Sequence, residues 1–314
     1  MKINAICKSM KRMTVYSIYA ACLSLALCLA GCGQEEMTEA GEQPADVMRF
    51  SLTHPDEGAR TRVTETHFEK DDRIGLYVCT AEAPLEVGGN YVNNALLTFN
   101  GSAWHPERPI FWNNGSYDVY AYYPQVSPVT SVDDLPFSVA TDQQAAGNEQ
   151  TPGGYEASDF LWASAKKQTA GNEAVKLNFR HCMSKLTVRL VKGPDYDGDE
   201  LPEAEVYVHN TVTEATVDLA VGIVTPAKFG KLHTVKAKAA GKDEYTAVLV
   251  PQRIANRVPL IEVVMKGVSY LVETNFRFKQ GIHHTFTLII SKNPEQVKIE
   301  IGGELENWTP QPEK

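Results

Sequence analysis

Cys32 is the residue whose surroundings point most directly to a chemical reaction. It follows Leu29-Ala30-Gly31, and small side chains of this kind fit the narrow subsites of a peptidase that cuts just before the cysteine. A cysteine thiolate is a strong nucleophile, so its sulfur can take a lipid chain. The pattern predicts that Cys32 is diacylated and becomes the N-terminus of the mature chain.

The residues before Cys32 have the organisation of an export signal. A basic stretch from Lys2 to Arg12 precedes Val15 to Ala30, which are uncharged. This apolar run is shorter than the roughly 20 residues that cross a bilayer as a helix, and it suits a signal peptide. With Cys32 it resembles the lipobox of bacterial lipoproteins, whereas an ordinary signal peptide with an incidental cysteine is the alternative.

The polar residues after Cys32 indicate how the chain is displayed. Gly33-Gln34-Glu35-Glu36 resembles the surface-export signal of lipoproteins in the Bacteroidetes. We therefore expect a signal peptide over residues 1–31 and a flexible tether over 32–46. The expected location is the outer face of the outer membrane, where multiple acyl chains give stable anchoring.

Other residue groups do not form a catalytic or metal-binding pattern. The sequence lacks a Gly-x-Ser-x-Gly elbow, a His-Glu-x-x-His pair, a phosphate-binding glycine loop and a dinucleotide fingerprint. His283 and His284 are neighbours in an expected strand, so they point to opposite faces, and His181 is expected to be structural. The acidic turn 195–200 lacks the spacing of a calcium loop. We expect neither an enzyme nor a cofactor or metal.

The charge of the chain argues against nucleic-acid binding. The 314 residues carry 30 Lys and Arg against 39 Asp and Glu, a net charge of −9. Residues 1–31 contain four of the cations and no acid, so the other 283 residues carry −13. Such a surface repels phosphate backbones.

Apolar residues from Val47 onward recur mainly with a period of two, which is typical of strands with one buried face. Turn residues such as Lys266-Gly267 and Gly302-Gly303 separate the alternating segments. No long segment has a helical period, so the sequence predicts an all-β chain of antiparallel β-sandwiches. The alternating segments are 48–53, 73–79, 116–122, 185–190, 205–209, 216–219, 245–250, 261–265, 270–273, 284–290 and 297–301.

The expected domain boundary follows a polar stretch that ends at Glu173. The run from Val175 to Leu186 is long enough to be the last strand of one domain and the first of the next. We therefore expect an N-terminal sandwich over 47–174 and a C-terminal sandwich over 175–314. Residues 139–157 are rich in Gln, Gly, Asn and Pro and are expected to form a long surface loop.

Two groups of side chains have alternative interpretations. Cys79 and Cys182 are the two cysteines after Cys32, and they are either one disulfide or, as we slightly prefer, two buried thiols. The aromatic residues between Trp104 and Tyr123 could bind a glycan. Their alternation favours a place in the core instead.

Four groups of motifs resemble the signature of the fimbrillin family of Bacteroidales, and they follow one another in the order given below. Ala215–Leu219 and Trp308 also fit, and Asp71 stands where that family usually has glycine. The motifs are Thr66-x-Phe68-Glu69-x-x-Asp72-Arg73-Ile74-Gly75-Leu76-Tyr77, then Pro109–Trp112 with Asp118–Pro124, then Thr141-Asp142-Gln143-Gln144 with Ser158–Ala163, and Phe179-Arg180-His181-x-x-Ser184-Lys185-Leu186.

The resemblance implies two transthyretin-like antiparallel β-sandwich domains in a lipoprotein precursor of type V pili. It implies that an arginine-specific protease removes an N-terminal strand and that subunits then polymerise by strand exchange. The expected function is a shaft or tip subunit of a cell-surface fimbria whose partners are other fimbrial subunits. The alternative is a monomeric surface lipoprotein that acts as an adhesin for glycan or protein.

If the chain is processed, the cut is expected after Arg60 or Arg62, and an inert surface loop is the alternative. Both arginines lie in the small, polar stretch 58–63, and exposed segments of this composition are preferred sites of nicking. Arg49 is a poorer candidate, because it lies inside an alternating run and would be held in a sheet.

The expected donor strand is the C-terminal stretch 296–308. Val297, Ile299 and Ile301 alternate with polar residues, and Pro294 separates the stretch from the preceding strand. An unpaired sheet edge is a template for such a strand. The stretch could also complete its own domain, so both interpretations stay open.

The lipidation site gives the first prediction. Mass spectrometry of the membrane-extracted protein should find acyl chains on Cys32, because the three residues before it and the short apolar run fit a lipoprotein signal. The variant Cys32→Ala should lose both the lipid and the membrane attachment. A Cys32→Ala protein that stays membrane-bound and is processed normally would contradict the prediction.

Overall fold

The computed structural model describes residues 46–56, 67–148, 151–306 and 308. Within these ranges the regular structure is almost all β-strand, and the two helices are single 3-10 turns, η1 (Glu156–Ser158) and η2 (Pro294–Gln296). The predicted all-β class is confirmed. Neither turn in the described ranges has the length or apolar character that crossing a bilayer requires.

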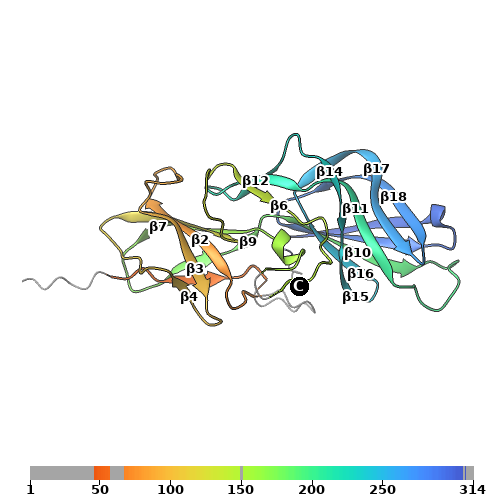
Figure 1. The fold of residues 1–314 in the computed structure, drawn as a ribbon, viewed down its shortest axis with the longest axis horizontal. Coiled ribbons are helices and arrows are strands. Elements are labelled where there is room, and N and C mark those ends of the chain that lie inside the picture. Colours follow the sequence, from red (N-terminus) through yellow and green to blue (C-terminus); the bar gives the residue numbers. More distant parts are fainter. Residues whose placement is uncertain (1–45, 57–66, 149–150, 307, 309–314) are drawn as a thin grey trace, which may run out of the picture. The chain divides into compact units, whose positions relative to one another are not determined.

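A six-stranded sheet is built by strands of the first 181 residues, and Figure 1 shows several of them side by side. A separate two-stranded sheet pairs β1 (Phe50–Thr53) with β8 (Val175–Asn178). In spatial order the six strands are β4 (Trp104–Pro106), β3 (Val92–Phe99), β2 (Arg73–Thr80), β5 (Ser116–Tyr123), β7 (Leu161–Thr169) and β9 (Arg180–His181).

The central strands β2 and β5 are buried on both faces, which explains their nearly continuous apolar and aromatic sequences. Ile74 and Leu76 of β2 face one hydrophobic core, and Tyr77 and Cys79 face another. Because side chains alternate along a strand, a sheet covered on both sides needs apolar residues at successive positions.

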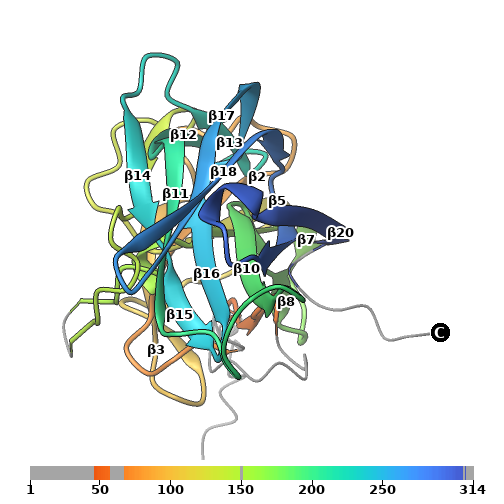
Figure 2. The ribbon, with the colours of Figure 1, turned by 90° about the vertical axis from the view of Figure 1, so that its right-hand side faces the viewer.

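Two further sheets contain most strands after residue 183, and Figure 2 shows β10, β16 and β15 next to one another. One five-stranded sheet has the order β15 (Lys238–Gly241), β16 (Glu244–Leu249), β10 (Ser184–Lys192), β19 (Ile282–Ile290) and β20 (Lys298–Glu306). The four-stranded sheet has the order β14 (Leu232–Lys236), β11 (Ala204–Val212), β17 (Gln252–Met265) and β18 (Val268–Phe278). A third hydrophobic core, which includes Leu186, Val263 and Phe286, lies between them.

The turn between β17 and β18 is the predicted Lys266-Gly267. Its two residues have φ angles of 49° and 77°. Positive φ at both positions matches the twist of a two-residue hairpin, and glycine takes it without steric cost. This turn therefore sets the register of the adjoining residues 261–265 and 268–272, and the pairing shifts beyond them.

Gly302-Gly303 does not end a strand, so the prediction of a break there is wrong. Strand β20 continues to Glu306, and its pairing with β19 shifts register between His284 and Phe286. The glycines supply the extra residue of a β-bulge, which bends the strand without ending it.

The pairing also differs from a wholly antiparallel arrangement. β1 pairs with β8 in parallel, and so does β10 with β19. Parallel neighbours are joined by long connections rather than by tight turns. Local alternation identifies such strands but does not reveal their direction.

A small sheet joins the two halves of the sequence. Its strands are β13 (Ile223–Pro226), β12 (Glu214–Asp218) and β6 (Leu135–Ser138), and Val217 packs in the same core as Tyr120 and Val250. β8 and β9 pair with β1 and β7, whereas β10 begins the five-stranded sheet. The domain boundary between residues 174 and 175 stays a prediction.

Most described residues of the expected surface loop 139–157 are exposed or half-buried, but Gln143 packs against β16, so that prediction is wrong where Gln143 lies. Gln143 is fully buried, and its side-chain amide donates to the Val248 carbonyl at 2.6 Å. Its side-chain oxygen accepts from the Val248 N–H at 2.8 Å. The amide replaces a neighbouring strand, because buried backbone groups need partners.

This contact predicts a large loss of stability in Gln143→Ala. The variant leaves a buried N–H and a buried carbonyl of Val248 unpaired, which should cost about 3 kcal/mol of unfolding free energy. Urea unfolding measures it, with Gln144→Ala as the matched control, since Gln144 accepts one exposed bond from Ala239 N–H. Equal, small losses in both variants would contradict the prediction.

Candidate strand-exchange site

The segment 46–53 holds two separate parts of the chain through its backbone. On one side, the Met48 N–H donates to the Ile110 carbonyl at 2.8 Å, and the Trp112 N–H donates to the Asp46 carbonyl at 2.7 Å. On the other side, residues 50–53 pair in parallel with β8. These bonds fix the segment as a strand between two neighbours.

Side chains of the same segment fill one face of a hydrophobic core. Met48 is 2% exposed, and Phe50 and Leu52 pack at the edge of the core that contains Trp112 and Leu177. Burial of such a side chain contributes about 1.5–3 kcal/mol. The predicted alternation of Met48, Phe50 and Leu52 is thus present.

Asp56, three residues after β1, reaches a buried histidine. His181 is 2% exposed, and its Nε2 lies 3.1 Å from Asp56 Oδ2. Its Nδ1 lies 2.9 Å from Asp159 Oδ2. Because a carboxylate accepts at each nitrogen, both ring N–H groups donate, which requires the protonated imidazolium.

The electrostatics agree with this protonation state. Burial lowers the pKa of His181, but the carboxylates of Asp159 and Asp56 outweigh it and raise the pKa to about 9. Burial raises the pKa of Asp56, and its hydrogen bond to charged His181 brings the pKa below its usual value. Burial and the charge of His181 lower the pKa of His54 to about 4.

Trp308 covers the ring of His181. The two ring centroids are 3.6 Å apart with an interplanar angle of 12°, and Trp308 is 5% exposed. The Lys185 ammonium lies 5.4 Å from the indole centroid. The last described residue of the chain therefore docks on the histidine that binds Asp56.

The expected donor stretch is the edge strand of its own sheet. Strand β20 pairs antiparallel with β19, and within the described residues it has no strand on its other side. Val297 and Ile299 pack partly buried at the edge of a core, whereas Ile301 is 49% exposed. In this monomer the stretch thus completes the five-stranded sheet, and its role as a donor stays a prediction.

The predicted lipidation and cleavage residues have no described surroundings. Cys32, Arg60 and Arg62 all lie outside the described residues. Arg49 is described, and its carbonyl accepts from the Val175 N–H at 2.8 Å. Arg49 thus lies directly before β1, and its backbone is bonded to the first residue of β8.

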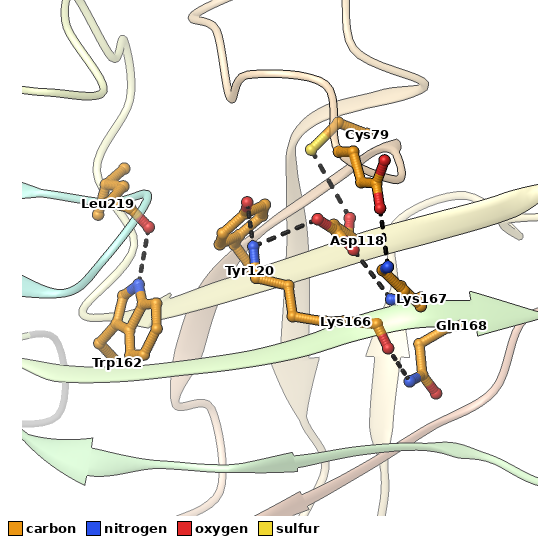
Figure 3. Close-up of polar contacts among 9 residues, drawn as sticks. Cys79, Asp118, Tyr120, Trp162, Lys166, Lys167, Gln168 and Leu219 are labelled. Carbon is orange, nitrogen blue, oxygen red and sulfur yellow. Dashed lines mark hydrogen bonds and ion pairs between the residues drawn. The ribbon is translucent and has the colours of Figure 1, made fainter.

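A second polar cluster, drawn in Figure 3, joins β5 to β7. Lys166 Nζ contacts the Tyr120 hydroxyl and lies 3.3 Å from Asp118 Oδ2, and the Lys167 N–H donates to Asp118 Oδ1 at 2.9 Å. Burial raises the pKa of Asp118, but the Lys167 N–H and the Lys166 ammonium bring the pKa below its usual value. A stable ion pair of this kind gives neither a free base nor a nucleophile.

The cysteines and most of the grouped aromatic residues are core residues, as preferred from the sequence. Cys79 and Cys182 are separate, buried thiols. Tyr117, Tyr120 and Tyr122 are each at most 5% exposed. Among the described residues no group of three His, Cys, Asp or Glu could hold a metal ion.

The comparison of sequences decides the family. A family profile described as fimbrillin-like matches residues 61–308. The chain belongs to this family. A search of curated proteins gave no match.

Solved structures share the fold at low sequence identity. A candidate cell adhesion protein of Bacteroides uniformis has a TM-score of 0.64 at 17% identity, covering 85% of this chain and 99% of that one. A candidate cell adhesion protein of Bacteroides ovatus has a TM-score of 0.61 at 18% identity, with coverages of 85% and 99%. The tip fimbrial protein Mfa3 of Porphyromonas gingivalis, truncated at its C-terminus, has a TM-score of 0.51 at 8% identity, with coverages of 84% and 100%.

These findings make the chain a fimbrial or adhesin-like protein of the cell surface. The fimbrillin-like family is structural rather than catalytic. The fold of this chain is a β-sandwich fold, as the resemblance to the fimbrillin family implied.

Sequence reasoning did not find the roles of Asp56 and Trp308. The Phe179-x-His181 motif drew attention to the histidine, but its carboxylate partners lie 125 and 22 residues away in the sequence. Spacing along a chain does not reveal such pairs. The position of Asp56, just after the first alternating run, is the one available indication.

The raised pKa of His181 predicts a specific pH dependence of stability. The group contributes fully below its unfolded pKa of about 6.5, and the contribution is lost as pH rises through about 9. A shift of this size corresponds to about 3 kcal/mol. Urea unfolding should give the wild-type protein a higher free energy of unfolding at pH 6 than at pH 9.5. The variant His181→Gln should lose most of this difference between the two pH values. An unchanged difference in His181→Gln would show that another group causes it.

Proposed function

We propose that this protein is a shaft or tip subunit of a fimbria, exported as a lipoprotein and assembled by strand exchange after N-terminal proteolysis. The observation that carries the proposal is the pairing of residues 46–53. This segment precedes Arg60 and Arg62 in the sequence, yet it contributes Met48 to a hydrophobic core. Cleavage at either arginine would separate a core strand from the rest of the chain.

Loss of the segment would open a groove with a defined chemistry. The N–H of Val175 and the N–H of Phe179 now donate to carbonyls of Arg49 and Thr53 and would lose these partners. The apolar places of Met48, Phe50 and Leu52 would become empty. An exposed edge with an apolar trough favours the addition of a strand from another chain.

The C-terminal stretch 296–308 suits the role of donor. It forms an edge strand, so it leaves its sheet by breaking the bonds to one neighbour, β19. Val297, Ile299 and Ile301 repeat the alternation of the segment that would depart. Burial of three such side chains from full exposure contributes about 5–8 kcal/mol. The gain on exchange is smaller than this, because Val297 and Ile299 are already partly buried in the monomer.

Export and anchoring complete the proposal. A lipid on Cys32 and the tether 32–46 would hold the precursor at the outer face of the outer membrane until an arginine-specific protease cuts. Release from the lipid and opening of the groove then result from the same event. The groove between β8 and residues 110–112 would accept a strand, and the C-terminal stretch 296–308 would supply one.

Processing is tested by Arg60→Lys with Arg62→Lys, which keeps both charges but removes the recognition of arginine. The wild-type protein, treated with an arginine-specific protease, should begin at Thr61 or Val63 and form fibres in electron micrographs. The double variant should stay intact and monomeric. Arg49→Lys is the matched control and should behave as the wild type. A processed N-terminus at Cys32, Met48 or Phe50 would contradict the cleavage site.

The donor is tested by truncation after Asn293. Strand exchange predicts a folded monomer that is still cleaved but no longer forms fibres. A truncated protein that forms fibres, or that does not fold, would contradict this donor assignment. Wild-type protein that stays monomeric after cleavage, and instead binds glycan or host protein, would favour the adhesin alternative.

A further inference from the structure

His181 is contacted from both ends of the described chain. Asp56, the last described residue before 67, lies 3.1 Å from its Nε2, and Trp308 stacks on its ring with centroids 3.6 Å apart. Asp56 is upstream of Arg60 and Arg62, whereas Trp308 follows the expected donor residues. One buried side chain therefore touches the segment that would be removed and the segment that would be donated.

The attachment of Trp308 depends on its ring contacts. Its indole nitrogen is buried and has no hydrogen-bond partner among the described residues. A cation on the face of an indole ring is favourable by about 0.5–2 kcal/mol, the larger value applying to desolvated sites. The imidazolium of His181 provides such a cation, so the docking of Trp308 depends on the charge of His181.

That charge depends in turn on Asp56. The titratable groups that face the imidazole are Asp56 and His54 after β1 and Asp159 before β7, and the Lys185 ammonium on β10 lies over the Trp308 ring and near Asp56. Two of these are carboxylates, and Asp56 is the one that would leave with the N-terminal segment. Its loss would place a buried imidazolium against a single carboxylate, which favours loss of the proton.

We propose that His181 couples residues 46–56 to the C-terminal stretch 297–308. While Asp56 is bound to His181, the C-terminal stretch stays docked on its own subunit. The precursor is then autoinhibited as a donor, and removal of the N-terminal segment loosens Trp308. The biological meaning of this coupling rests on the proposed strand exchange. The coupling itself is a property of the uncleaved monomer.

The test is hydrogen–deuterium exchange of the full, uncleaved protein, followed by mass spectrometry. Asp56→Asn keeps the size of the side chain but removes its charge, and it should speed exchange of the amides of residues 298–306 by about tenfold. Asp46→Asn is the matched control, because Asp46 is an exposed acid of the same segment. It should leave exchange of residues 298–306 unchanged.

The reverse variant tests reciprocity. Coupling between two sites acts equally in both directions, so Trp308→Ala should speed exchange of residues 46–56. If Asp56→Asn unfolds the protein and speeds exchange everywhere, the Trp308→Ala result decides. If neither variant changes exchange at the opposite end, the proposal is wrong.

The outcomes are separable from those of the strand-exchange test. Coupling in a protein that never forms fibres would overturn the proposed function and leave the coupling intact. Fibres from a protein without coupling would overturn the coupling alone.

Discussion

Unpaired backbone at the edges of β-sheets is the constraint on which this structure depends. Each buried N–H and carbonyl needs a partner, and the chain meets this need in three different ways. Residues 46–53 cover the edge of β8, the side-chain amide of Gln143 covers Val248, and β20 covers β19. Two of these three covers are residues 46–53 and β20, which are the segments that the proposed strand exchange would move.

Local sequence patterns predicted the strands well, because alternation follows directly from burial on one face. They also located the hairpin at Lys266-Gly267, where a two-residue turn needs positive φ. They did not predict which strands run parallel, since β10 and β19 are far apart in the sequence. They also misread Gly302-Gly303, because glycine serves equally well in a turn and in a bulge.

At the candidate site, too, local patterns identified residues but not their distant partners. Met48, Phe50 and Leu52 were recognised by their alternation, and the family motifs pointed to Gln143, Trp162 and His181. The motifs did not give the roles of these residues, which depend on distant partners. The Trp162 indole donates to the Leu219 carbonyl at 2.7 Å, as Figure 3 shows, and so joins the six-stranded sheet to the turn after β12. The polar side-chain atoms of Gln143 and Trp162 thus hydrogen-bond parts of the chain that are distant in sequence.

The parallel pairing of β1 with β8 also bears on the kind of polymer that would result from strand exchange. A replacement strand that keeps this pairing has to enter in one direction, and the groove and the donor are different segments of the same chain. Such a contact is heterologous, so it repeats without closing and gives an open filament with two unlike ends. One end would offer an empty groove and the other an unused C-terminal strand. A subunit that retains residues 46–56 would have its groove filled, and by the coupling proposed above it would also keep its C-terminal stretch on its own sheet. It could then neither accept nor donate a strand, so the supply of cleaved subunits would set filament length.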